Sequence, residues 1–119
     1  MITLIDRFPA SQLGQLRPAN TTAASVYAPA SHYRTEIIEI FISNTTGSSA
    51  DYRLFHDEDG TTYDETTALV FDTAVAANST TILNTKIWMN GASGGNLGVR
   101  TSTNSALTFT VYGVEEKIR

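Results

Sequence analysis

Hydrophobic and polar residues alternate with a period of two along most of this chain. The clearest example is Ala106–Gly113, in which Leu107, Phe109 and Val111 alternate with threonine and tyrosine. Successive side chains of a β-strand point to opposite faces, so this pattern predicts a strand with one apolar and one polar face. Because no segment sustains the 3.6-residue period of an amphipathic helix, we expect an all-β protein.

Apolar or alternating runs are separated by short segments rich in Gly, Asn, Ser and Pro, which are typical of turns. About eight short strands at such regular spacing predict an antiparallel β-sandwich or barrel. We expect one such domain over residues 21–119, with a charged tail after Gly113. The predicted strands are Thr22–Ala28, Tyr33–Ser43, Ala50–His56, Thr67–Val75, Thr80–Asn84 and Lys86–Met89 (separate or one bent strand), Leu97–Ser102 and Ala106–Gly113.

The longest predicted strand is apolar on both faces. Alternation places Ile38, Ile40 and Ile42 on one face, and Ile37 and Phe41 on the other. Strands that are apolar on both faces are usually covered on both sides. One face of a simple sandwich should be in contact with water, so we expect Ile37 and Phe41 to contact a partner surface or the N-terminal segment.

Residues 1–20 are predicted to form an extended N-terminal arm. Pro9 and Pro18 interrupt this segment, and its apolar residues follow neither a helical nor a strand period, although Leu13–Arg17 could form one short strand. The arm has many apolar residues for a free tail, so we expect it to dock on its own subunit or on a neighbouring one. The expected contact residues of the arm are Ile5, Phe8, Leu13 and Leu16.

Composition and charge exclude several classes of function. The chain has no cysteine, so disulfides, thiolate zinc sites and cysteine nucleophiles are ruled out. No basic stripe of the kind that binds nucleic acid is present, and no run approaches the roughly 20 apolar residues that cross a bilayer. No secretory signal is visible at the start of the sequence. Charged residues make up 17% of the chain, below the roughly 25% of a typical domain, which favours a surface that can be buried in an assembly.

The acidic stretch HDEDGTTYDETT is the strongest candidate for a metal site. Asp57, Asp59 and Asp64 could provide oxygen ligands for calcium. The EF-hand register fails, however, because position six is Thr62 and position twelve is Ala68. An Asp-Gly dipeptide between two strands is also a strong turn signal. We therefore favour a hydrated connection between strands, and we predict no metal site and no cofactor.

No arrangement of residues indicates an enzyme. The acids crowd one polar loop instead of facing each other across a cleft, and neither a G-x-S-x-G elbow nor a phosphate-binding loop is present. We predict no catalytic residues. A carbohydrate-binding face remains an alternative, because stacking rings could come from Trp88, Tyr112, Tyr27 and Tyr63.

The sequence over about residues 34–113 resembles a group of small structural proteins of tailed bacteriophages. The shared features are NTTG after a long strand, a DGTTYD-like loop, a VAAN turn, a glycine-rich MNGASGGNLGV segment and a final ALTFTVYG strand. The likeness covers about two thirds of the chain, and it consists of turn and strand motifs that say nothing about chemistry.

This resemblance implies a jelly-roll-like β-sandwich that belongs to a virion. In its favoured form the protein decorates or cements the capsid by binding between major capsid protein subunits, and it is itself a homo-oligomer, most often a trimer. The alternative is a tail-associated adaptor, collar or fibre-linked protein, or a carbohydrate-binding module on a tail. Assembly in the reducing cytoplasm of the host agrees with the absence of cysteine.

Overall fold

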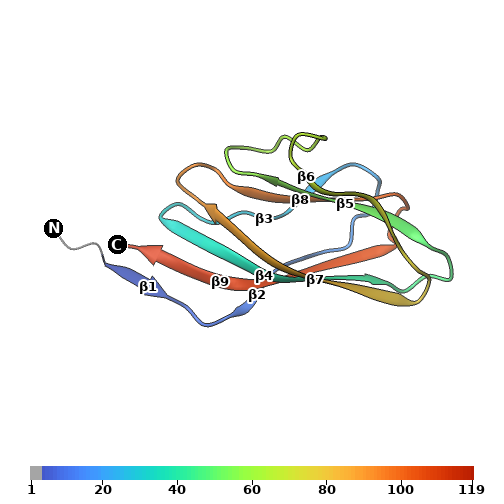
Figure 1. The fold of residues 1–119 in the computed structure, drawn as a ribbon, viewed down its shortest axis with the longest axis horizontal. Helices are drawn as coiled ribbons and strands as arrows, with labels where there is room; N and C mark the ends of the chain where they lie inside the picture. The colour runs from blue at the N-terminus through green and yellow to red at the C-terminus, as the bar shows by residue number, and fades with distance from the viewer. Residues whose placement is uncertain (1–3) are drawn as a thin grey trace.

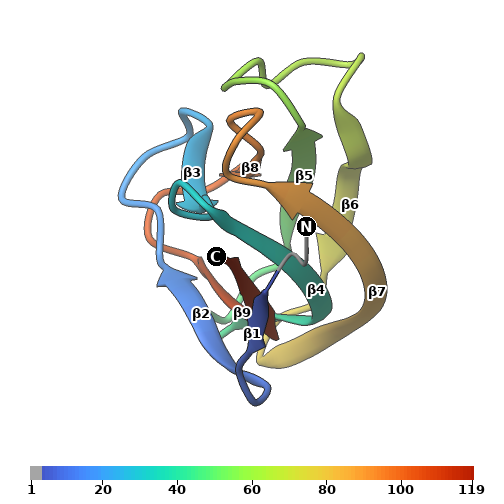
Figure 2. The ribbon, with the colours of Figure 1, turned by 90° about the vertical axis from the view of Figure 1, so that its left-hand side faces the viewer.

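The strands of the protein form two antiparallel sheets that pack face to face (Figures 1 and 2). The computed structural model describes residues 4–119, so residues 1–3 of the predicted arm lie outside the described part. Within the described range no helix is long and apolar enough to cross a membrane. The strands are β1 (Ile5–Arg7), β2 (Ser11–Leu16), β3 (Ala24–Tyr27), β4 (Tyr33–Asn44), β5 (Ala50–Asp57), β6 (Ala68–Val75), β7 (Ser79–Asn90), β8 (Asn96–Thr101) and β9 (Leu107–Ile118).

The first sheet has the strand order β1-β9-β4-β7, with β2 also paired to β9, and the second has the order β3-β8-β5-β6. β1 pairs with the C-terminal part of β9 and β2 with its N-terminal part, so the two act as two pieces of one first strand. Counted in this way, the chain is an eight-stranded double-sheet jelly roll. The predicted all-β, jelly-roll-like antiparallel sandwich is confirmed.

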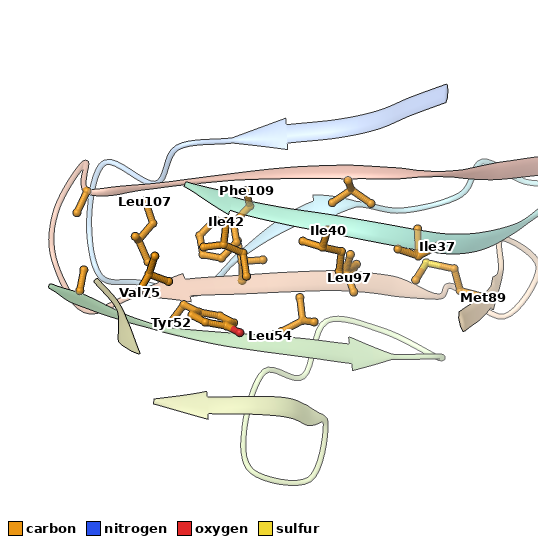
Figure 3. Close-up of a cluster of buried hydrophobic side chains, with 14 residues drawn as sticks. Ile37, Ile40, Ile42, Tyr52, Leu54, Val75, Met89, Leu97, Leu107 and Phe109 are labelled. Carbon is orange, nitrogen blue, oxygen red and sulfur yellow. The ribbon is translucent and has the colours of Figure 1, made fainter. Parts of the chain in front are cut away.

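The hydrophobic core lies between the two sheets. In Figure 3, Ile40 and Ile42 of β4 and Phe109 of β9 point toward Tyr52 and Leu54 of β5. Phe109 and Tyr52 meet edge-on, with ring centroids 6.2 Å apart. The core therefore joins residues from opposite halves of the sequence, and its formation brings the two sheets into a single unit.

A β-bulge in β4 reverses part of the predicted facing. The register of β4 against both β7 and β9 shifts between Ile37 and Glu39, so the strict alternation is interrupted at Ile38. As a result Ile37 is in the core with 0% exposure, whereas Ile38 is 39% exposed. The prediction that Ile37 faces outward and Ile38 inward is wrong, because a bulge inserts one residue and exchanges the faces on one side of it.

The first strand, β1, and the C-terminal part of β9 lie side by side in the first sheet (Figure 1). β9 continues to Ile118, and Val114 and Glu116 are buried, so the predicted charged tail after Gly113 is wrong. The backbone N–H of Arg119 donates to the Leu4 carbonyl (2.7 Å). Over residues 5–16 the predicted arm thus lies along β9 of the same chain, as the edge of the first sheet.

Candidate functional site

The acidic stretch connects β5 to β6 and is held in place by its own carboxylates. Asp57 is buried at the end of β5, where its Oδ2 accepts the backbone N–H of Thr62 (2.8 Å) and its Oδ1 that of Asp59 (3.2 Å). These N–H groups of Thr62 and Asp59 hold the pKa of Asp57 below its usual value. The pKa of Asp59 is raised, because its carboxyl group hydrogen-bonds to the Asp57 side chain and lies beside the negative charge of that carboxylate. Asp57 therefore caps a turn.

Asp64 caps a second turn in the same loop. Its Oδ1 accepts the backbone N–H of Thr66 (2.8 Å) and the hydroxyl of the same residue. Both bonds, with the hydroxyl contributing most, lower the pKa of Asp64. Within residues 4–119 no three His, Asp or Glu side chains gather in a way that could hold a metal ion. The structure does not unite Asp57, Asp59 and Asp64, the three candidate calcium ligands.

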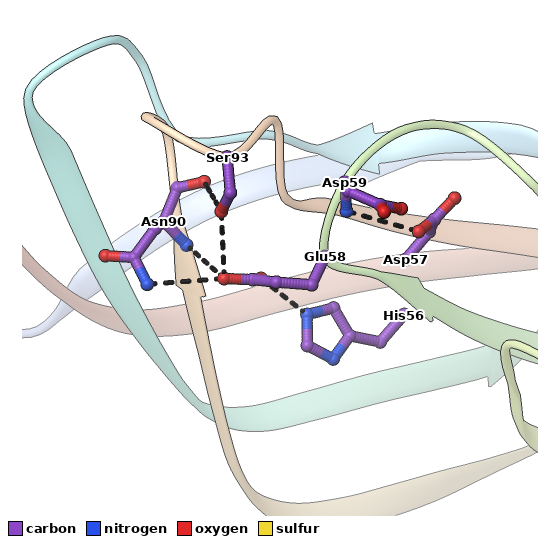
Figure 4. A network of polar contacts seen from close by, with 6 residues as sticks. All are labelled: His56, Asp57, Glu58, Asp59, Asn90 and Ser93. Carbon is purple, nitrogen blue, oxygen red and sulfur yellow. Dashed lines mark hydrogen bonds and ion pairs between the residues drawn. The ribbon is translucent and has the colours of Figure 1, made fainter.

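Glu58 fastens the acidic loop to the turn between β7 and β8 (Figure 4). One of its carboxylate oxygens accepts the backbone N–H and the side-chain amide of Asn90 and the hydroxyl of Ser93, each at 3.2 Å. The other oxygen lies 3.1 Å from Nε2 of His56. Sequence reasoning gave Glu58 no role, because Asn90 and Ser93 are more than 30 residues away from it and no local motif indicates these contacts.

Two of the candidate stacking residues, Tyr27 and Tyr63, are structural. The hydroxyl of Tyr27 donates to a carboxylate oxygen of Glu115 (2.6 Å), and burial together with this bond raises the pKa of Tyr27. The hydroxyl of Tyr63 donates to Asn96 (2.6 Å). The ring of Tyr63 covers Gly98, where an added Cβ would lie 2.3 Å from a ring carbon. Both tyrosine hydroxyls are therefore engaged in contacts within the chain.

The outward-facing side of β4 and β7, which we call the β4–β7 face, combines exposed apolar and charged side chains. Ile82 and Trp88 of β7 are 50% and 44% exposed. Phe41 lies opposite Ile82 in the strand register, and its ring meets that of Tyr112 edge-on with centroids 5.6 Å apart. This face also contains Arg34, whose guanidinium lies over the Trp88 ring at 5.9 Å from its centroid, and it includes Ile38, Glu36, Glu39 and Lys86.

A second exposed apolar group surrounds β1. Ile5 and Phe8 are exposed, and the ring of Phe8 stacks on that of Tyr33 with centroids 6.2 Å apart. The backbone N–H of Phe8 donates to the Glu115 carbonyl (2.9 Å), which fixes the segment after β1 to β9. These two apolar side chains are therefore presented on an ordered strand edge.

The predicted partner-binding residues thus fall into two groups. Ile5 and Phe8 are exposed and Phe41 is half-buried on the β4–β7 face. Leu13 and Leu16 pack against the core of their own chain, and Ile37 is a core residue. Sequence reasoning missed Ile82 as the neighbour of Phe41 on this face, because this relation depends on the pairing of β4 with β7.

A cavity of about 230 Å³ opens at the far end of the same two strands. It contains no charged or aromatic side chain, and it is lined by Ser43, Asn44, Thr45, Asn78, Ser79 and Thr80. The hydroxyl and amide groups that line it are those that hydrogen-bond neutral polar molecules.

No protein family and no curated protein matches this chain. Solved structures with a similar fold include the T13 viral particle of infectious bursal disease virus, at 9% identity and a TM-score of 0.51 over 98% of this chain and 31% of that one. The coat protein of tobacco streak virus matches at 9% identity and 0.42 over 97% and 85%. A pilus-forming appendage protein of Bacillus endospores matches at 14% identity and 0.42 over 97% and 87%.

At these identities the likeness concerns the fold. The chain spans about a third of the length of the infectious bursal disease virus chains that it matches, with 31–33% of each covered. The TM-score of 0.51 agrees with the two-sheet jelly roll derived above from strand order.

Proposed function

We propose that this chain is a non-enzymatic structural protein of a virion, and specifically a decoration or cement protein of a tailed bacteriophage capsid. The observation that carries the proposal is the jelly-roll body with ordered apolar side chains on its outside, at Ile5 and Phe8 beside β1 and on the β4–β7 face. The fold likeness to a chain of a viral particle and the sequence resemblance described above point in the same direction.

The proposed mechanism is cementing by many repeated contacts. A specific interface buries roughly 1,600 Å² in total, and symmetry-related copies add avidity to contacts that are individually modest. In this proposal Ile5 and Phe8 insert between major capsid protein subunits. β1 holds these side chains in position, because it pairs with β9 within the chain itself and does not depend on the capsid for its order.

The test is co-sedimentation of the purified protein with capsids that lack it. The double variant Ile5→Ser, Phe8→Ser removes two exposed apolar side chains, and burying each of them contributes roughly 1.5–3 kcal/mol. We expect at least a tenfold loss of capsid binding with little change in melting temperature. Leu69→Ser is the control, because Leu69 is more exposed than Ile5 and Phe8 but lies on β6 of the second sheet. Unchanged binding of the double variant would overturn the capsid-contact role.

A tail location is the alternative within the same class. Quantitative mass spectrometry of separated heads and tails distinguishes the two, because a cement protein partitions with heads. A carbohydrate-binding role is favoured only by the polar cavity beside Ser43 and Thr80. Binding to a glycan array that is lost in Asn78→Ala would support that role.

A further inference from the structure

Asn90 and Gly91 form the only Asn-Gly dipeptide of the chain. Asn90 is exposed at the end of β7, where the turn to β8 begins. Glycine has no Cβ and few conformational limits, so its backbone nitrogen can approach the side-chain amide carbon of the preceding asparagine. The fold also requires this glycine, because an added Cβ would lie 1.9 Å from the carbonyl oxygen of Ala30. Asn90 is therefore the asparagine whose side-chain amide is most open to attack by its own backbone.

The reaction open to this dipeptide is deamidation, and it needs only water. The Gly91 nitrogen attacks Cγ of Asn90, a bond forms between these two atoms, and the side-chain amide leaves as ammonia with the proton of the Gly91 nitrogen. Water then opens the resulting succinimide ring at either carbonyl, which gives aspartate or isoaspartate. The product has a carboxylate where the chain had a neutral amide, and isoaspartate also adds a methylene group to the backbone.

Both reacting groups are held by hydrogen bonds in the folded chain. The backbone N–H of Gly91 donates to the carbonyl of Tyr33 (2.8 Å). Nδ2 of Asn90 donates to Oε2 of Glu58 (3.2 Å), and the backbone N–H of Asn90 donates to the same oxygen (3.2 Å). Ring closure must break the bond to Tyr33 and turn the Asn90 amide away from Glu58. The reaction is therefore slow while these bonds are in place.

The carboxylate that restrains Asn90 comes from a different loop. Glu58 lies just after β5, and the same carboxylate oxygen also accepts the hydroxyl of Ser93 (3.2 Å), as Figure 4 shows. These bonds lie at the surface, where contacts between loops open at a small cost in free energy. The rate of deamidation should therefore follow the opening of the contact between the β5–β6 loop and the turn after β7.

The product of the reaction cannot keep the contact with Glu58. The donor Nδ2 of Asn90 is replaced by a carboxylate oxygen, which can only accept a hydrogen bond. This oxygen takes the place of an atom that lies 3.2 Å from Oε2 of Glu58. Two carboxylates so close together repel each other, so deamidation separates the two loops.

We propose that Asn90 is a self-modification site of this chain, at which deamidation is delayed by Glu58 and, once it has occurred, releases the β5–β6 loop from the turn between β7 and β8. The modification needs no enzyme and is not reversed once ammonia is lost, so it accumulates with the age of the folded protein. It is independent of the proposed virion function and of the capsid contact at Ile5 and Phe8.

Mass spectrometry of one tryptic peptide tests the proposal. Trypsin cleaves after Lys86 and Arg100, so the peptide Ile87–Arg100 contains Asn90 and, as an internal control, Asn96. During incubation at mildly alkaline pH, deamidation of this segment in the folded wild type should be confined to Asn90. It should be at least about tenfold slower than in the free peptide, which corresponds to a free energy of opening of about 1.4 kcal/mol.

Removal of the restraining carboxylate should accelerate the reaction. In Glu58→Ala, Asn90 should be converted at least about fivefold faster than in the wild type, because its amide loses a charged hydrogen-bond partner. Glu65→Ala is the matched control, because it removes an exposed carboxylate from the same loop and should react at the rate of the wild type. A wild type in which Asn90 stays intact or reacts as fast as the free peptide, or equal rates in the two variants, would overturn the proposal.

A variant that carries the charge of the product gives a second readout, which does not depend on the folding of Glu58→Ala. Asn90→Asp should lower the melting temperature by a few degrees, whereas Asn104→Asp, the same change in an exposed turn, should not. Adding Glu58→Gln to Asn90→Asp exchanges the donor and the acceptor, so the double variant should recover most of the loss. An Asn90→Asp variant as stable as Asn104→Asp, or a double variant less stable than Asn90→Asp alone, would contradict the release of the loop.

Discussion

Arg7 in β1 and Glu116 in β9 are 109 residues apart in the chain, yet Nη1 of the arginine lies 2.8 Å from Oε2 of the glutamate. The other carboxylate oxygen accepts a bond from Nε of Arg34 at 2.7 Å. Glu116 is thus held between two strands, and it fastens the first residues of the described chain to the last strand. The guanidinium groups of Arg34 and Arg7 lower the pKa of Glu116.

The Glu116 cluster predicts a specific pH dependence of stability. Because the pKa of Glu116 is lower in the folded than in the unfolded chain, its stabilising contribution is present above the unfolded value of about 4.5 and is lost as the pH falls through the folded value. Glu116→Gln should lower the free energy of unfolding by about 1 kcal/mol at pH 7, since both arginines are partly exposed. Urea unfolding at pH 7 and pH 3 checks this. A difference between variant and wild type that is as large at pH 3 as at pH 7 would contradict it.

The bulge in β4 predicts opposite outcomes for two adjacent isoleucines. Ile37→Ala leaves a cavity in the core and should destabilise the protein by about 2–5 kcal/mol. Ile38→Ala removes an exposed side chain and should change stability by less than about 0.5 kcal/mol. Chemical denaturation of both variants measures the two values. If Ile38 proved to be the costly position, the register shift of β4 would be wrong.

Alanine substitution is expected to destabilise the protein at Gly91 but not at Gly47. A Cβ added at Gly91 would lie 1.9 Å from the carbonyl oxygen of Ala30, and that oxygen belongs to backbone that cannot rotate away. Gly91→Ala should therefore cost about 1–3 kcal/mol, as overpacking does elsewhere. Gly47 has no atom within 4 Å of an added Cβ, so Gly47→Ala is the matched control. Thermal unfolding of both variants should show a marked drop in melting temperature for Gly91→Ala alone.

The acidic loop predicts that calcium has no stabilising effect. Asp57 and Asp64 already accept backbone N–H groups, so a cation would have to compete with these bonds for the same oxygens. Calorimetric titration with calcium should give no binding heat, and chelator should leave the melting temperature unchanged. Asp57→Ala should lower the melting temperature by a few degrees, because two turn N–H groups lose their acceptor. A melting temperature that rises with calcium would overturn this assignment.

Contacts between neighbouring residues of the site could be predicted from the sequence, whereas contacts between distant segments could not. The use of Asp57 and Asp64 as turn caps agrees with the hydrated connection expected from the Asp-Gly signal, because caps act over two to five residues. The bonds of Glu58 to Asn90 and Ser93 join segments that are distant in the chain, and no local pattern contains them. The same is true of the relation between Phe41 and Ile82, which is created by strand pairing.

The alternation of side chains by itself determined that this protein is built of β-strands, because a period of two is a local property that each run of residues shows on its own. It also placed Leu107, Phe109 and Val111 in the core, where they are fully buried. Only the tertiary structure decided that residues 5–16 form the edge of the first sheet, that β9 continues to Ile118, and that Ile37 lies inside while Ile38 lies outside. Those features depend on which strands pair and where a bulge shifts their register, and both are set by contacts between residues far apart in the sequence.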